Sequence, residues 1–203
     1  MIDHRDRVLV IACGALAKEM RDVVRLNSLD WVDVECLPAR FHNTPALIPA
    51  AVEERLDSAR GHYREVFVGY ADCGTGGLLD KVLEARGVER LPGAHCYEFF
   101  ATSGDFAAMH DQEPGTFYLT DFLVKHFDRL VWNGLGLDRW PHLRDDYFGN
   151  YKRLVYLSQV ESPDLVDRAR TAASRLGLDF EHRAVGYGEM ATTLVEVTSR
   201  VPA

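Results

Sequence analysis

Three of the four cysteines in this 203-residue chain lie where an apolar segment gives way to a glycine-rich or polar one. Cys13 ends the segment VLVIAC, Cys73 lies in YADCGTGG, and Cys96 lies in PGAHCYEFF. A thiolate is the form of cysteine that binds metal ions, and the amide groups at a helix N-terminus favour its negative charge. Three thiolates can hold a zinc ion with one open position, or a [4Fe-4S] cluster with one free iron. We therefore expect Cys13, Cys73 and Cys96 to form a zinc or iron-sulfur site, with the choice between the two left open.

Polar residues beside these cysteines are candidates for the remaining chemistry. Asp72, His95 and Glu98 are candidate acid-base groups, because such side chains next to a metal can relay protons or orient a ligand. Helix capping is the alternative role for the two carboxylates. The glycine-rich segment after Asp72 can approach an anion closely with its backbone, which predicts that it binds a ligand. Polar side chains elsewhere could line the same pocket. The candidate ligand-binding residues are Gly74, Thr75, Gly76, Gly77, His42 and Tyr151.

Two further interpretations of the cysteines stay open. In a metal-free enzyme, Cys73 or Cys96 would be the nucleophile and His95 its base. Alternatively the thiols pack in the core, since cysteine is among the most buried residue types. Packing is the expected role of Cys36, although Cys36 or His95 could complete a metal site.

The elements that must position these residues alternate between strand and helix. Apolar runs predict strands ending near Cys13, Cys36 and Tyr70, a brief one near residue 90, and two more at 154–157 and 180–185. Helices are expected to follow these runs, and residues 116–136 are expected to form one long amphipathic helix. This alternation predicts a mainly parallel, three-layer α/β/α sheet of Rossmann-like architecture. The chain length fits a single α/β domain over residues 1–203, or two tightly joined lobes.

Composition narrows the expected partners and compartment. The net charge of −8 argues against nucleic acid and anionic membranes as main partners, because both select basic patches. The chain carries no apolar run of about 20 residues and no evident signal peptide, so we expect a cytoplasmic protein whose cysteines are not structural disulfides. The oligomeric state is not readable, although homodimers are common.

Several separated motifs together resemble one family. They are ACGAL, YADCGTGGLLD, PGAHCYEFF, FYLTDFL, YFGNYKRLVYLSQ and GYG. From Val8 to Tyr187 the chain resembles the domain of unknown function 1638 family. The resemblance carries over Cys13, Cys73 and Cys96, and it implies a role in one-carbon or methyl metabolism beside corrinoid-dependent methyltransferases. The expected partner is then a small-molecule substrate or a corrinoid methyltransferase protein, for which the chain would be an enzyme or an accessory protein.

Overall fold

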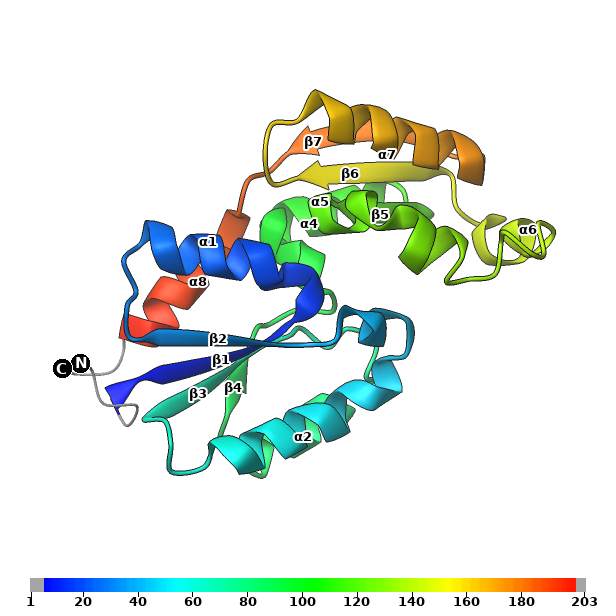
Figure 1. Cartoon of the computed structure of the whole chain (residues 1–203). Helices are drawn as coiled ribbons and strands as arrows, with labels where there is room; N and C mark the ends of the chain where they lie inside the picture. Colours follow the sequence, from blue (N-terminus) through cyan, green and yellow to red (C-terminus); the bar gives the residue numbers. More distant parts are fainter. Residues whose placement is uncertain (1–5, 200–203) are drawn as a thin grey trace. The chain divides into compact units, whose positions relative to one another are not determined.

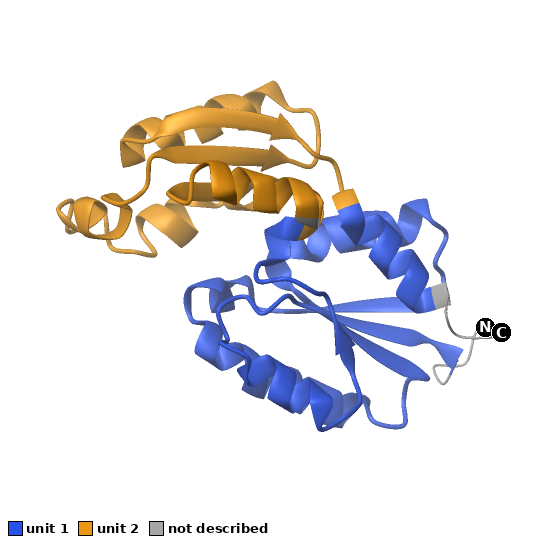
Figure 2. Ribbon diagram, turned by 180° about the vertical axis from the view of Figure 1, so that it is seen from behind, with its two compact units in different colours: residues 1–98, 189–203 blue, residues 99–188 orange. Residues whose placement is uncertain are grey.

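The computed structural model describes residues 6–199 and divides the chain into two compact units, shown in Figure 2. Unit 1 comprises Met1–Glu98 and Glu189–Ala203, and unit 2 comprises Phe99–Gly188. Each unit contains its own parallel sheet flanked by helices. The parallel α/β class expected from the sequence is therefore confirmed, although the strands form two sheets rather than one.

Unit 1 contains a four-stranded sheet with the order β2-β1-β3-β4. Its strands are β1 (Val8–Cys13), β2 (Val32–Leu37), β3 (Glu65–Gly69) and β4 (Glu89–Arg90). Every residue of β1 is buried, as is typical of a central parallel strand with helices on both faces. Figure 1 shows α1 (Ala17–Leu26) and α8 (Gly188–Ser199) over one face of this sheet and α2 (Ile48–Ala59) over the other.

Short helical segments complete the connections of unit 1. Two of them, η3 and η4, lead from β2 into α2, and η2 directly follows the end of β1. The segments are η2 (Gly14–Leu16), η3 (Ala39–Asn43), η4 (Pro45–Leu47), α3 (Leu78–Glu84) and η5 (Cys96–Phe100), the last of which continues into unit 2. They therefore place three cysteine-bearing junctions in unit 1.

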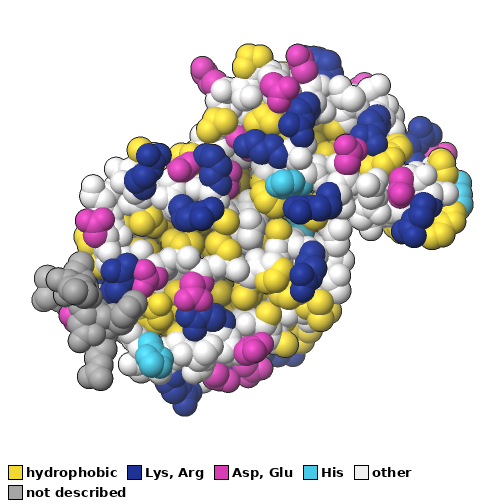
Figure 3. All heavy atoms as spheres, in the orientation of Figure 1, with side chains coloured by type: hydrophobic (Ala, Val, Ile, Leu, Met, Phe, Trp, Pro, Cys, Tyr) yellow, Lys and Arg dark blue, Asp and Glu magenta, His cyan; other side chains and the backbone are white. Residues whose placement is uncertain are grey.

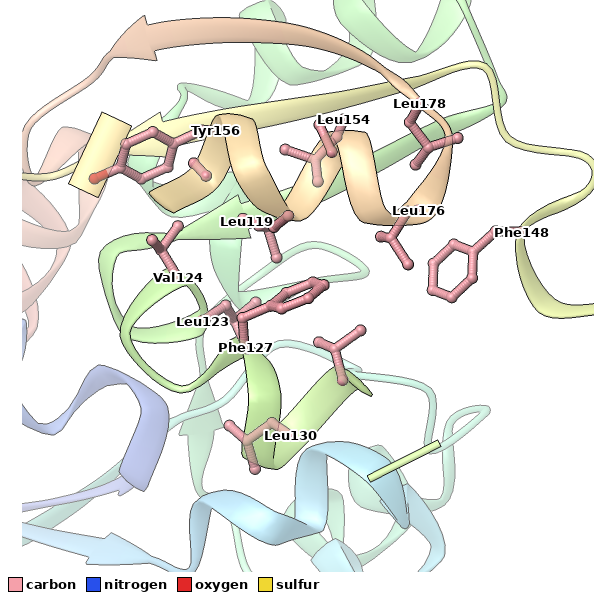
Figure 4. Packing of buried hydrophobic residues seen from close by; sticks show 14 of the residues in the cluster. Leu119, Leu123, Val124, Phe127, Leu130, Phe148, Leu154, Tyr156, Leu176 and Leu178 are labelled. Atoms are coloured by element: carbon pink, nitrogen blue, oxygen red, sulfur yellow. The ribbon is translucent and has the colours of Figure 1, made fainter. Parts of the chain in front are cut away.

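Unit 2 contains a three-stranded parallel sheet in the sequential order β5-β6-β7. Its strands are β5 (Thr116–Thr120), β6 (Arg153–Ser158) and β7 (Asp179–Ala184). Its helical segments are α4 (Ser103–Gln112), α5 (Asp121–Lys125), the π-helical η6 (Asp128–Trp132), α6 (Leu143–Phe148) and α7 (Pro163–Leu176). Figure 4 shows leucine and aromatic side chains from β5, β6, α5 and α7 packed into one core, which explains how this small sheet is stabilised.

The expectation of a single helix over residues 116–136 is wrong. Residues 116–120 form strand β5, and helix α5 begins only at Asp121. The hydroxyl of Thr120 accepts a hydrogen bond from the amide of Leu123, so Thr120 caps the helix directly after the strand. The sequence TFYLT is rich in β-branched and aromatic residues, which favour a strand, and it runs without a break into the apolar face of α5. Helix α4 was not expected at all.

On the face of the protein shown in Figure 3, acidic and basic side chains are interspersed with hydrophobic ones. Many charged side chains of the described residues are paired, as in the bidentate contact between Arg7 and Asp33. Within residues 6–199, no helix combines the length and apolar character needed to cross a membrane.

Candidate functional site

The order of the strands in unit 1 reverses between β1 and β3. The chain passes from β1 to β2 on one side and then returns to add β3 on the other side of β1. In open parallel sheets the carboxyl ends of two such strands border a crevice, which is the usual place for a ligand. Cys13 is the last residue of β1, and the pairing of Ala12 with Gly69 puts Tyr70 level with it after β3. The candidate site therefore lies at this reversal point.

Cys73 and Cys96 are in direct contact at the same edge of the sheet. Their Sγ atoms are 2.7 Å apart. The amide of Cys73 donates to the carbonyl of Ala94 at 2.8 Å, and the amide of Asp72 donates to the carbonyl of Gly93 at 3.1 Å. These backbone bonds hold the loop after β3 against the segment that leads to Cys96, so the contact between the thiols does not depend on the sulfur atoms alone.

The backbone of Cys73 adopts a left-handed conformation that residues other than glycine rarely take. Its φ is +50°, and among the described non-glycine residues only Ser28 shares a positive φ. Such strained residues persist where the surrounding structure holds them, and they are common at functional sites. Here the strain turns the Cys73 side chain toward Cys96.

The two thiols in contact differ in acidity. A hydrogen bond from the Cys96 thiol lowers the pKa of Cys73, and an amide bond from Cys96 lowers it further, against the effect of burial. The same hydrogen bond, together with burial, raises the pKa of Cys96 well above its usual value. Cys73 is therefore the more acidic thiol of the pair.

Cys13 and Tyr70 form the buried side of the site. Burial raises the pKa of the Cys13 thiol to about 11, although the amide of Ala15 donates to its sulfur. Tyr70 is 1% exposed, and its hydroxyl has no hydrogen-bond partner of adequate geometry within residues 6–199. Burial raises the pKa of Tyr70, and the neighbouring Cys13, Cys96 and Cys73 raise it further. Three thiols and one phenol thus meet within electrostatic range of one another.

Asp72 organises the glycine-rich loop rather than facing a ligand. Its carboxylate accepts hydrogen bonds from the hydroxyl of Thr75 at 2.7 Å and from the amides of Gly76 and Gly77 at 3.2 and 2.9 Å. These bonds lower the pKa of Asp72, although partial burial acts in the opposite direction. The donors expected to bind an external anion are therefore engaged inside the loop, and the structure assigns Gly74, Thr75, Gly76 and Gly77 to holding Cys73 in place.

Glu98 has a similar role on the other cysteine segment. Its carboxylate accepts hydrogen bonds from the amides of Ala94 at 3.1 Å and His95 at 2.9 Å. The exposed ring of His95 stacks on Tyr97, with 5.0 Å between the ring centroids. His42 is exposed as well, and desolvation and the charge of nearby His95 lower its pKa.

The structure assigns other surroundings to Tyr151 and Cys36. Tyr151 belongs to unit 2, where its ring packs against Phe117 and Phe148 with centroid distances of 6.0 and 5.6 Å. Aromatic packing therefore accounts for Tyr151. Cys36 is an exposed thiol on β2, and its strand partner on β1 is Ala12.

Sequence reasoning did not single out Tyr70 as part of the site. The letters VFVGYADC read as a strand followed by a cysteine, and an aromatic residue at a strand end normally packs in the core. The available signal was its position three residues before Cys73. Only the register of β1 against β3 shows that its hydroxyl adjoins Cys13.

The sulfur positions can be compared with those of a metal site. Among the described residues, no three His, Cys, Asp or Glu side chains are arranged to bind one metal ion together. Two thiolates on one zinc ion, each about 2.3 Å from it at a tetrahedral angle, lie about 3.8 Å apart. The 2.7 Å between Cys73 and Cys96 is shorter by about 1 Å, so the two side chains would have to rotate apart to accept an ion. The donor set itself, three soft thiols beside an unsatisfied phenol, suits zinc or iron.

Comparison with known proteins identifies a family. A family model described as "Protein of unknown function (DUF1638)" matches residues 36–194, more than three quarters of the chain. The matched part contains Tyr70, Cys73 and Cys96 and begins after Cys13. No curated protein and no solved structure matches the chain.

Proposed function

The chain belongs to the DUF1638 family, and we propose that it is a metalloprotein whose Cys13, Cys73 and Cys96 hold a zinc ion or an iron-sulfur cluster. One observation carries this proposal: Cys13 ends β1, and the contacting pair of Cys73 and Cys96 lies in the loops after β3 and β4, at the edge where the strand order of the unit 1 sheet reverses. An enzyme with a nucleophilic thiol needs one cysteine in its site, and a dithiol redox site needs two. A third, buried thiol at the same point is what a three-ligand site requires.

Each residue of the site would have a distinct part in holding the group. Cys13, Cys73 and Cys96 would each bind as a thiolate, and Cys73 is the more acidic of the contacting pair. Asp72 and Glu98 would hold the two loops through their backbone amides. A zinc ion or cluster with three protein ligands supplies a Lewis-acid position for a fourth ligand. The hydroxyl of Tyr70 is the nearby donor that could hydrogen-bond to that ligand.

The family resemblance also motivates a proposal about context. We propose a cytoplasmic enzyme that acts beside a corrinoid-dependent methyltransferase, with a small-molecule thiol or the corrinoid protein as its partner. If the chain were instead an accessory protein, it would bind the corrinoid protein stably. Alanine variants of the three site cysteines would then keep full function in that assembly.

The metal content of anaerobically purified protein tests the leading proposal. Zinc, iron and sulfide are determined together with the visible spectrum for the wild type and for Cys13→Ala, Cys73→Ala and Cys96→Ala. Cys36→Ala is the matched control, because Cys36 is exposed on β2. We expect about one zinc, or about four irons with four sulfides, in the wild type and the control, and strong loss in the other three variants. Neither metal in the wild type, or equal content in all variants, would overturn the proposal.

A further inference from the structure

The contact between Cys73 and Cys96 resembles the state just before a disulfide forms. The sulfurs are 2.7 Å apart, and a disulfide bond is about 2.05 Å long. Closing that gap needs only small side-chain rotations. The pair therefore has a reaction open to it that requires no metal and does not involve Cys13.

The backbone on both sides of the pair is already fixed in position. The hydrogen bonds from Cys73 to Ala94 and from Asp72 to Gly93 join the two segments directly. The carboxylate of Asp72 ties down the loop after Cys73, and the carboxylate of Glu98 ties down the segment before Cys96. These bonds hold both segments in place while the two sulfurs are in contact.

The four cysteines are not equivalent in access. Cys73 is partly exposed and lies beside exposed Gly74 and Gly76, which leaves room for a small disulfide to approach. Cys13 is 5% exposed, and the amide of Ala15 donates to its sulfur. Cys36 is exposed but lies on another strand. Cys73 and Cys96 are therefore the two partly exposed thiols in contact, and either can be the attacking sulfur.

We propose that Cys73 and Cys96 form a dithiol-disulfide couple that reduces small-molecule disulfides. The thiolate of one cysteine of the pair attacks one sulfur of the substrate R–S–S–R, forms a mixed disulfide and releases one thiolate. The other cysteine gives its proton to that thiolate and attacks the protein sulfur of the mixed disulfide, which releases the second thiolate. The two protein thiols are thereby oxidised to one disulfide, and the substrate disulfide is reduced to two thiols.

Alkylation after equilibration with oxidised glutathione tests this couple. The purified, reduced protein is incubated anaerobically with oxidised and reduced glutathione in several ratios, quenched with iodoacetamide under denaturing conditions, and weighed intact. We expect four alkyl groups on the reduced protein and two on the oxidised protein, with peptide mapping placing the disulfide between Cys73 and Cys96. The equilibrium constant for forming the disulfide with glutathione should be on the order of 10²-fold higher in the folded protein than in the protein unfolded by urea. The reason is that the fold has already closed the loop between two cysteines 23 positions apart.

Variants separate this couple from the proposed metal site. Cys73→Ser and Cys96→Ser should each leave a mixed disulfide with glutathione or no disulfide, whereas Cys36→Ser and Cys13→Ala should still form the bond between Cys73 and Cys96. Loss of metal in Cys13→Ala with retention of the disulfide would support both proposals, and metal-free wild-type protein that forms the disulfide would support this one alone. Four alkyl groups at every glutathione ratio, a bond that involves Cys13, or no preference for the folded protein would overturn it.

Discussion

Replacing Tyr156 by phenylalanine removes one oxygen atom from a buried hydrogen-bond network in unit 2. The hydroxyl of Tyr156 donates to the carboxylate of Asp121 at 2.7 Å, and both residues are at most 1% exposed. The same carboxylate accepts the amides of Gln159 and Val160 at 3.0 and 3.2 Å. The amide of Asp121 in turn donates to the side-chain oxygen of Gln159 at 2.8 Å. The network therefore joins the carboxyl ends of β5 and β6.

The expected cost follows from the chemistry of the lost bond. A hydrogen bond to a charged group contributes about 1.5–3 kcal/mol, and the acceptor here is a carboxylate that has no water to replace the donor. Two backbone donors remain, so the carboxylate keeps most of its solvation. We therefore expect Tyr156→Phe to lower the free energy of unfolding by about 2 kcal/mol.

Urea denaturation followed by circular dichroism and tryptophan fluorescence measures this change. Tyr147→Phe removes the same atom from a side chain that is 47% exposed, and this control should change the free energy by less than about 0.5 kcal/mol. In an Asp121→Ala background, Tyr156→Phe should also cost less than about 0.5 kcal/mol, because the acceptor is gone. A loss below about 0.5 kcal/mol in the otherwise wild-type protein would refute the reasoning.

Three further predictions concern other parts of the chain. Tyr70→Phe should leave the unfolding free energy of the metal-free protein unchanged or raise it by up to about 1 kcal/mol in urea denaturation, because the hydroxyl is buried without a good partner; a loss of 2 kcal/mol would contradict this. The raised pKa of Cys13 means that the folded state holds this proton more tightly than the unfolded state. The resulting contribution to the free energy of unfolding is complete below pH 9 and is lost as the pH rises to about 11. In urea denaturation, the free energy of unfolding of Cys13→Ala should therefore fall less with pH across that window than that of the wild type. Gly188→Ala should lower the melting temperature by several degrees more than Gly186→Ala, because its Cβ would fall on the carbonyl oxygens of residues 99 and 100 whereas the Cβ at Gly186 would meet open space; equal shifts would contradict it.

The sequence predicted best where local signals and tertiary burial agree. The run VLVIAC is buried on both faces and therefore appears as an unbroken apolar segment, which made β1 and the position of Cys13 predictable. Ser162 caps α7 with its side chain and Pro163 supplies a fixed φ at the first helical position, residue types that indicate a helix start in the sequence itself. In both cases a few adjacent residues carry the whole signal.

The errors arose where neighbouring elements share an apolar pattern or where long-range pairing decides the geometry. Residues 116–136 change from strand to helix at Thr120 without a glycine or proline to mark the boundary. The contact between Cys73 and Cys96 depends on a positive φ and on hydrogen bonds between segments about 20 residues apart. The sequence left acid-base work and capping both open for Asp72 and Glu98, because sequence letters do not show which amides a carboxylate will bind.

The division of unit 1 into two stretches of sequence has a consequence for synthesis of the chain. Helix α8, which carries residues Glu189 to Ser199 of unit 1, is made only after all of unit 2, and the indole of Trp31 donates to the carbonyl of Thr198 across 167 positions. A ribosome translating at about 5–20 residues per second therefore needs several seconds between Glu98 and Glu189. Throughout that interval the nascent unit 1 has its cysteines and strands but not its last helix, so the apolar face that α8 later covers is left to the nascent chain itself or to chaperones.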